Sequence, residues 1–159
     1  MLVEAHVAIH GSRAAVWAAL TDIENAAKTL SGVEVIEIVE RPAAGLVGLR
    51  WRETRLLLGK KATAEKWITD AAENEFYQTR SESDGFLFLS TVRLAESDGC
   101  VTLTSAHDTR PQAVLARLMS LPMLLFKGVA RRALVQDLND IKSAVEQARP
   151  ERTKAVDGS

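Results

Sequence analysis

The stretch VAIHGSRAAVWAALTDIENAAKTLSGVEVIE, residues 7–37, decides the fold, because a strand, two short helices and a second strand follow one another within it. The first strand covers residues 3–10, where apolar and polar side chains alternate well enough for a strand. Gly11 and Ser12 break this strand, and Ser12 is a good N-cap for the helix that follows. The apolar side chains of this helix are Val16, Trp17 and Leu20.

The second half of this stretch predicts another short helix and another strand. Thr21 and Asp22 are suitable caps for a helix that ends near Ser31 and Gly32. Residues 33–40, VEVIEIVE, are rich in β-branched side chains and are typical of a strand. The chain is therefore expected to pass between its first two strands through helices.

Turn-forming residues divide the middle of the chain into further strands. The strand-like runs lie at about residues 46–58, 62–70, 75–83, 86–96 and 100–109. They are separated by Gly59-Lys60, Asp84-Gly85 and Asp98-Gly99. An Asp-Gly pair between two strand-like runs is among the strongest hairpin signals, so this region predicts an antiparallel meander.

After the last strand, the pattern changes to that of a long helix that reaches about Gln147. Its apolar side chains recur at helical spacing on one face, at Leu134, Leu138, Ile141 and Val145. Pro122 and Gly128 should kink or interrupt the first half of this helix. The polar residues 149–159 are expected to form a disordered tail, which leaves residues 1–148 as a single domain.

Together these elements predict an α+β fold. A strongly curved antiparallel sheet that has only one long helix must wrap around that helix to bury both apolar faces. We expect such a wrap to leave a space between the sheet and the helix.

This order and several local motifs resemble the START-related superfamily, also called SRPBCC, which has the helix-grip fold. Within residues 7–37, the opening strand, Val16-Trp17 in the first helix and Leu20-Thr21-Asp22 before the second match the family. Residues 48–69, GLRWRETRLLLGKKATAEKWIT, look like the family's central strand pair joined at a glycine. The resemblance covers about residues 3–147 and is closer to the polyketide cyclase/dehydratase and lipid-transport-like bacterial branch.

The resemblance implies a protein that binds an apolar ligand, without defining a reaction. Members of the superfamily bind lipids, sterols, polyketides or other apolar small molecules in the cavity, and some members are enzymes. The superfamily has no universal catalytic motif, so the resemblance assigns no catalytic residue to this chain.

The charge balance argues against a nucleic-acid-binding protein, since 20 Lys and Arg residues and 21 Asp and Glu residues give a net charge of −1. Cys100 is the single cysteine, which excludes an internal disulfide and fits a reducing cytosol. His6, His10 and His107 show no metal-binding spacing, and no glycine-rich phosphate loop is present. The most apolar segment, residues 118–126, is too short to span a bilayer. We expect a cytoplasmic protein without a metal or cofactor.

The two Asp-Gly pairs, taken as tight two-residue turns, fix which residues of the meander face each other. Asp98-Gly99 then places Ser90 opposite His107, and Asp84-Gly85 places Thr79 opposite Ser90. Both hairpins bring one set of side chains to a common face, which we assign to the concave side because it is the more apolar. This set is Tyr77, Thr79, Phe88, Ser90, Val92, Leu94, Val101, Leu103, Ser105 and His107.

The concave face carries a polar row, Thr79–Ser90–His107. We expect this row to orient the polar end of a mostly apolar ligand, because a few convergent polar groups in an apolar pocket suit such a site. The plainer interpretation is that His107 only hydrogen-bonds a neighbour or water inside the sheet. A Ser–His nucleophile is disfavoured, because Asp108 points to the opposite face and no GxSxG elbow is present.

The run RWRETRLLL, residues 50–58, divides its charges between the two faces of a strand. Trp51, Glu53 and Arg55 share one face. We assign that face to the cavity because apolar residues of the next strand join it, namely Ala62, Ala64 and Ile68. Buried charges need partners. Glu53 and Arg55 would bind a carboxylate or hydroxyl of the ligand, act as general acid or base, or form a structural ion pair, which we prefer.

The register of this strand depends on the turn that follows it. A tight Gly59-Lys60 turn is our first expectation. The facing pairs would then be Trp51–Ile68, Arg52–Trp67 (a cation–π contact) and Glu53–Lys66. A three-residue loop would instead place Arg55 opposite Glu65.

The apolar run at residues 118–126 needs more surface than one helix stripe provides. We expect it to cap the cavity at its entrance, with Leu118, Met119, Met123 and Phe126 as lining residues. A homodimer contact and transient docking on a membrane are the alternatives. Lys127, Arg131 and Arg132 keep the membrane alternative open, although we prefer to interpret them as a solvated helix face.

Three functions are therefore in competition. The leading one is a non-enzymatic carrier or sensor of a small apolar ligand of lipid, polyketide or aromatic type. The second is a cyclase/dehydratase-like enzyme with acid and base groups among Glu53, Arg55, Tyr77 and His107. The third is an interaction module whose apolar helix segment binds a protein or a membrane.

Overall fold

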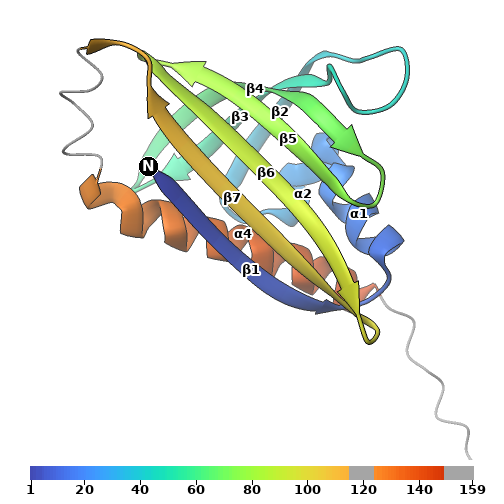
Figure 1. Cartoon of the computed structure of the whole chain (residues 1–159). Helices are drawn as coiled ribbons and strands as arrows, with labels where there is room; N and C mark the ends of the chain where they lie inside the picture. The colour runs from blue at the N-terminus through green and yellow to red at the C-terminus, as the bar shows by residue number, and fades with distance from the viewer. Residues whose placement is uncertain (115–123, 149–159) are drawn as a thin grey trace, which may run out of the picture.

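A strongly curved antiparallel sheet dominates the computed structural model, which describes residues 1–114 and 124–148 (Figure 1). Its seven strands are β1 (Leu2–His10), β2 (Val33–Glu40), β3 (Arg50–Leu57), β4 (Lys60–Ala72), β5 (Phe76–Ser83), β6 (Phe86–Ser97) and β7 (Cys100–Pro111). Across the sheet they run in the order β1-β7-β6-β5-β4-β3-β2, so β1 and β2 are the edges. The predicted antiparallel helix-grip architecture is confirmed.

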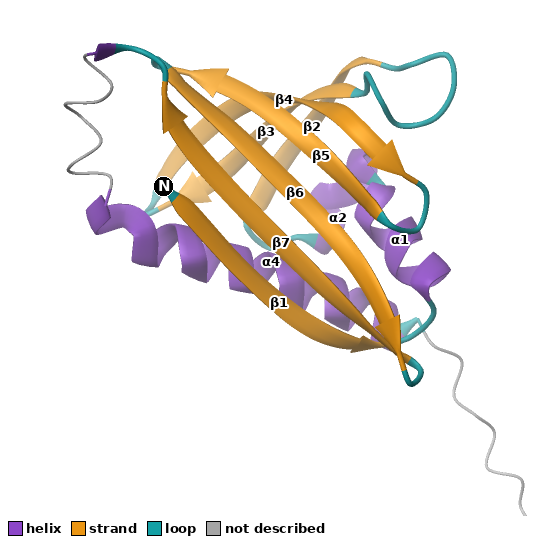
Figure 2. Cartoon of the chain, in the orientation of Figure 1, coloured by secondary structure: helices purple, strands orange, loops and turns teal. Residues whose placement is uncertain are grey.

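Helices cover the concave side of this sheet (Figure 2). Between β1 and β2 lie α1 (Arg13–Thr21), the 3-10 turn η1 (Ile23–Asn25) and α2 (Ala26–Thr29). A 3-10 turn η2 (Leu124–Phe126) leads into α4 (Lys127–Gln147), the long C-terminal helix. The predicted interruption at Gly128 is wrong, because Gly128 lies within the first turn of α4. Pro122 and the predicted tail at 149–159 lie outside the described residues.

The capping predictions have different outcomes. Ser12 caps α1, and its Oγ accepts a hydrogen bond from the backbone N–H of Ala15 at 3.1 Å. Asp22 makes no such bond to the backbone of η1, and instead accepts from the side-chain amide of Asn25 at 2.9 Å. The expected second helix is therefore a 3-10 turn followed by a single α-helical turn, rather than one capped helix.

Both Asp-Gly hairpins have the predicted register. Thr79 lies opposite Ser90, and Ser90 lies opposite His107. Asp84 and Asp98 have φ angles of 51° and 52°, the left-handed conformation that aspartate tolerates and that tight hairpin turns require. Turn chemistry alone therefore fixes the central part of the concave face.

The predicted register of β3 and β4 is wrong. The turn is Leu58-Gly59, with φ angles of 50° and 77°, so the true pairs differ from those predicted by two residues. The observed pairs are Trp51–Lys66, Arg52–Glu65 and Glu53–Ala64. A shift of two residues leaves every side chain on its predicted face. It also places Arg50, not Arg52, over the ring of Trp67, with 4.6 Å between the guanidinium carbon and the ring centroid.

The start of β3 also differs from the prediction. A strand was expected from Leu46, but β3 begins at Arg50, because Gly48 has a φ of 94° that interrupts an extended strand. Leu49 is nevertheless buried and packs with Trp51 and Ile68 in one of the two core clusters.

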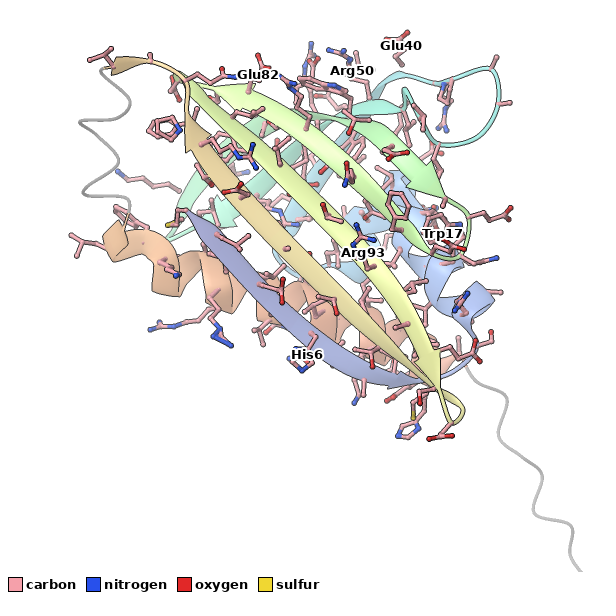
Figure 3. All side chains as sticks on the ribbon, in the orientation of Figure 1. His6, Trp17, Glu40, Arg50, Glu82 and Arg93 are labelled. Carbon is pink, nitrogen blue, oxygen red and sulfur yellow. The ribbon has the colours of Figure 1, made fainter. Side chains whose placement is uncertain are left out.

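The main core lies between the sheet, α1 and α4. Ile9, Val101 and Leu103 of the sheet are fully buried there, and the apolar stripe of α4 packs in the same cluster. The stripe consists of Leu134, Leu138, Ile141 and Val145, as its spacing predicts. His6 and Arg93, both labelled in Figure 3, are exposed on the opposite face of the strands. The concave face therefore supplies the protein interior.

Candidate functional site

A cavity of about 110 Å³ lies between the concave face of the sheet and the helices. The predicted lining residues that the structure places around it are Trp51, Glu53, Arg55, Tyr77, Thr79, Ser90, Val92, Leu103, Ser105 and His107. On the helix side, Leu20, Leu30 and Leu138 are among the apolar walls. The structure thus gathers in one place the polar row of the meander and the charges of β3.

The remaining predicted lining residues lie elsewhere. Phe88 and Phe126 do not reach the central cavity but line a neighbouring pocket of about 320 Å³, and the two spaces share Ser90 and His107. Phe88 has the predicted strand parity, yet it lies far enough along β6 for the curved sheet to carry it past the cavity. Leu118, Met119 and Met123 fall outside the described residues.

A charged network occupies the β3 and β4 side of the cavity. Glu53 is 6% exposed and accepts hydrogen bonds from the amine of Lys66 at 2.8 Å and from the Nε of Arg55. The indole N–H of Trp51 donates to the other carboxylate oxygen of Glu53 at 3.3 Å. Strand alternation places Trp51, Glu53 and Arg55 on one face, and the observed register brings Lys66 beside them.

Arg55 extends this network to the long helix. Its guanidinium reaches Asp137 of α4 with Nη2–Oδ2 at 2.8 Å and Nη1–Oδ1 at 3.1 Å, which is the bidentate geometry of strong arginine–carboxylate pairs. Two cations, Lys66 and Arg55, thus meet two anions, Glu53 and Asp137. The preferred interpretation of Glu53 and Arg55 as an ion pair agrees with this geometry.

Asp137 is a site residue that the sequence pattern alone did not identify, whereas Lys66 was expected beside Glu53, although in a different register. For Asp137 a signal was present, because it stands three residues after Leu134 and four before Ile141. A charged residue at that spacing falls on the apolar stripe of the helix and must find a partner in the interior.

The network changes the acidity of its members. Burial would raise the pKa of Glu53, but the charges of Lys66 and Arg55 and the hydrogen bonds from both outweigh it and lower this pKa to about 2. Burial disfavours the charged form of Arg55, yet the charges and hydrogen bonds of Glu53 and Asp137 raise its pKa. Burial raises the pKa of Asp137 in spite of its bonds to Arg55. Glu53 is therefore firmly ionised at neutral pH.

The polar row of the meander is electrically neutral. Burial, together with the positive charges of Lys66 and Arg55, lowers the pKa of His107 to about 4. The ring of His107 is therefore uncharged at neutral pH, and its Nδ1 lies 3.4 Å from the hydroxyl of Ser90. Burial and the nearby negative charge of Glu53 raise the pKa of Tyr77, so its phenol keeps its proton.

Several hydroxyl groups line the cavity. Thr79 and Ser105 are 7% and 4% exposed, and neither their hydroxyls nor that of Tyr77 bonds to another group within the described residues. The ring of Tyr77 is held edge-on against Trp17 of α1, with centroids 6.1 Å apart. Buried polar groups are almost always hydrogen-bonded. These hydroxyls are therefore available to water or to a ligand.

The described residues offer no evident metal centre, since no three His, Cys, Asp or Glu side chains among them gather as ligands would. None of the helices in the described part of the chain is long and apolar enough to cross a membrane.

Comparison with known proteins shows which solved structures share this fold. No family model and no curated protein matches the sequence. A START superfamily protein from Mycobacterium smegmatis superposes with a TM-score of 0.77 at 16% identity, over 93% of this chain and 99% of the other. The fold is that of the START-like proteins. The Zhui aromatase/cyclase from a Streptomyces species matches with a TM-score of 0.76 at 20% identity, over 100% of this chain and 99% of that one. A protein from Thermus thermophilus matches with a TM-score of 0.78 at 19% identity, over 93% of this chain and 99% of the other.

These similarities show that the chain has the START-like fold, which an aromatase/cyclase shares, and they confirm the fold that the sequence predicted. At such low identities, they carry no ligand or reaction over to this chain. The START-like fold is consistent with binding of a ligand in its interior, and the chemistry of that ligand has to be inferred from the side chains of this cavity.

Proposed function

We propose that this protein binds a small, uncharged and mostly apolar molecule in the central cavity, as a carrier or sensor. The observation that carries the proposal is the set of hydroxyls on Tyr77, Thr79 and Ser105, which line the cavity and have no hydrogen bond to another group among the described residues. A ligand with a hydroxyl or carbonyl group would bond to them while its apolar part contacts the leucines of α1 and α4. Such a combination of apolar walls and a few polar groups is typical of small-molecule sites.

The pairing of charges in the cavity favours an uncharged ligand. Lys66 and Arg55 are each already held by Glu53, and Arg55 also by Asp137. A ligand carboxylate would have to displace one of these anions and leave it buried without its partner, which is costly. A neutral hydroxyl or carbonyl group can bind without displacing either anion.

The cavity volume limits the size of the ligand. Pockets for drug-sized molecules occupy about 300–1,000 Å³, well above the 110 Å³ found between the sheet and α4. A longer ligand would extend past Ser90 and His107 into the neighbouring pocket of about 320 Å³. We therefore expect a compact polar end in the cavity and, in a larger ligand, an apolar remainder in the second space.

Catalysis of the cyclase/dehydratase kind is the second proposal, because a protein of similar fold is an aromatase/cyclase. General acid–base catalysts work best when their pKa lies near the working pH. The pKa of Glu53 is about 2, that of His107 is about 4, and that of Tyr77 is raised, so none of these groups is suited to proton exchange near neutrality. We therefore prefer the binding function. A cytoplasmic location, which the single cysteine favours, is part of the same proposal.

The experiment uses 2-naphthol, an uncharged aromatic alcohol, as the probe. Titration calorimetry should show saturable binding, and Thr79→Val should weaken it about fivefold because one hydrogen bond is lost without a change of shape. Thr91→Val, the same change on the opposite face of β6, should leave the affinity unchanged. Non-saturable uptake, or equal affinity for the wild-type protein and Thr79→Val, would contradict the proposal.

Native mass spectrometry of the freshly purified protein, followed by extraction, provides a second measurement. A bound neutral species with a hydroxyl or carbonyl group is the expected result. A charged metabolite that is retained equally by the wild-type protein and Thr79→Val would instead favour a site at the ionic network.

A further inference from the structure

The turn between β3 and β4 places a leucine where backbone chemistry disfavours it. Leu58 has a φ of 50°, and the other non-glycine residues with positive φ in the described chain are Asn74, Asp84 and Asp98. Asparagine and aspartate tolerate this left-handed conformation, whereas leucine does not adopt it readily. Leu58 is also 69% exposed, so burial does not explain the residue either. A strained and exposed apolar residue suggests a role outside the folded core.

Other exposed apolar side chains surround this turn. Leu56 and Leu57 are 49% and 41% exposed, and Leu125 and Phe126, just before α4, are 83% and 52% exposed. Leu57 and Phe126 line the same pocket, so the two segments adjoin, and Figure 1 shows the β3–β4 turn and the start of α4 at the same end of the molecule. We call this surface the apolar tip; its members are Leu56, Leu57, Leu58, Leu125 and Phe126.

Basic residues accompany the apolar tip. Residues 56–61, LLLGKK, and 125–135, LFKGVARRALV, contain no acidic residue, although the whole chain has a net charge of −1. Their exposed basic residues are Lys60, Lys61, Lys127, Arg131 and Arg132. Of these, Lys61 has an acidic partner within the described residues, Glu34 at 2.8 Å. This end of the protein is therefore both apolar and positively charged.

Two members of the apolar tip also line the pocket beside the central cavity. Leu57 and Phe126 line the pocket of about 320 Å³, and that pocket shares Ser90 and His107 with the central cavity. An apolar molecule that enters beside the tip would thus come within reach of the polar row.

We propose that the apolar tip docks on the surface of an anionic lipid bilayer. Leucine and phenylalanine would enter the boundary between headgroups and acyl chains, while the lysines and arginines would contact the anionic headgroups. A second copy of this chain is a poorer partner, because two apolar tips would bring like charges together. The inference does not depend on the proposed ligand, because it rests on the exposed apolar and basic side chains of the tip.

Co-sedimentation with vesicles that contain no other ligand tests this inference. The protein should bind vesicles of phosphatidylcholine and phosphatidylglycerol in equal parts, and should bind phosphatidylcholine vesicles far more weakly. Added salt should weaken the binding because it screens the headgroup charges. Arg131→Gln and Arg132→Gln should each weaken it about fivefold, since one cation near the surface is lost.

Leu58→Asn is the decisive variant, because asparagine suits the turn and the variant should fold at least as well as the wild-type protein. It should weaken vesicle binding about tenfold, as expected for the loss of one inserted leucine side chain. Val47→Asn and Arg41→Gln are matched controls at exposed positions outside the tip, and neither should change the binding.

Three results would overturn the proposal: no binding to the mixed vesicles, equal binding to phosphatidylcholine alone, or equal binding by Leu58→Asn and the wild-type protein. A wild-type dimer that Leu58→Asn converts to a monomer in sedimentation velocity would instead assign the tip to a second copy. Leu58, Arg131 and Arg132 line neither the central cavity nor the neighbouring pocket, so these variants should bind 2-naphthol like the wild-type protein, and failure of one proposal leaves the other unaffected.

Discussion

Asp137 of α4 holds Arg55 of β3 through two contacts, at 2.8 and 3.1 Å, and so ties the long helix to the sheet across the cavity. Arg55 in turn bonds to Glu53, which also accepts from Lys66. The bidentate contact at one end and the shared carboxylate at the other leave each charge of the network with a partner of opposite sign. The network therefore contains four charged side chains, but its net charge is zero.

Asp137→Asn should destabilise the protein by about 2 kcal/mol, because Arg55 would lose its anion on the helix while remaining largely buried. The side chains of Arg55 and Asp137 are each 19% exposed, so solvent reduces the cost below that of a fully buried pair. The free energy of unfolding in urea measures this effect. Asp140→Asn is a matched control one turn along the same helix.

Asp140 accepts hydrogen bonds from neutral groups of Ser31 and Gln136 at the protein surface, and asparagine keeps an acceptor oxygen, so this variant should cost about 1 kcal/mol or less. If both variants lowered the free energy of unfolding by the same amount, the Arg55–Asp137 pair would stabilise the protein no more than a surface contact does. The distinction tests whether the ionic network holds α4 against the sheet.

Stability should fall in acid because of Glu53. Its pKa is about 2 in the folded protein against an ordinary value of 4.5, so the unfolded chain binds this proton more tightly. The stabilisation is complete above the ordinary pKa and is lost as the pH falls toward 2; its size is of the order of 3 kcal/mol. Asp137, whose pKa is raised, acts in the opposite direction, because the folded protein takes up its proton more readily.

Urea unfolding of the wild-type protein and Glu53→Gln across this range measures the contribution. The difference in free energy of unfolding between the two should shrink between about pH 5 and pH 2. Glu4→Gln, on the exposed face of β1, is the control, and its free energy of unfolding should change with pH in the same way as that of the wild-type protein. A constant gap between the wild-type protein and Glu53→Gln would mean that Glu53 is protonated to the same extent in both states.

His107 should titrate far below neutrality. Burial and the charges of Lys66 and Arg55 lower its pKa to about 4 from 6.5, so the ring is neutral in the folded protein where the unfolded chain would take up a proton. This lowered pKa stabilises the fold above pH 6.5, and the contribution is lost as the pH falls from there toward 4. The NMR signal of the ring, assigned with His107→Gln, reports the midpoint. A midpoint near 6.5 would show that solvent reaches the ring.

Local chemistry explains which parts of the site could be predicted from the sequence. Asp84-Gly85 and Asp98-Gly99 fixed their hairpins, because aspartate and glycine both tolerate the positive φ of a tight turn. The β3–β4 turn was misplaced because Leu58 occupies the position where such a residue is expected. The faces were still correct, since strand parity survives a shift of two residues.

The features of the site that the sequence did not predict depend on tertiary geometry. Asp137 lies on the apolar stripe of α4, but nothing local identifies Arg55 as its partner across the cavity. Phe88 shares the parity of Ser90, yet the curvature of the sheet places it in the next pocket. Periodicity assigns a residue to a face, and only the folded sheet determines which position along that face meets the cavity.

Leu58→Asn should raise the stability of the protein by about 1 kcal/mol, because leucine is strained at a φ of 50° and asparagine is not. Thermal unfolding measures this gain. Leu56→Asn removes a similarly exposed leucine from an extended strand, so it should give no gain. If Leu58→Asn instead lowered the melting temperature, Leu58 would be packed within the protein rather than available to a membrane. A gain in stability combined with weaker vesicle binding would show that this position favours docking at the expense of the fold.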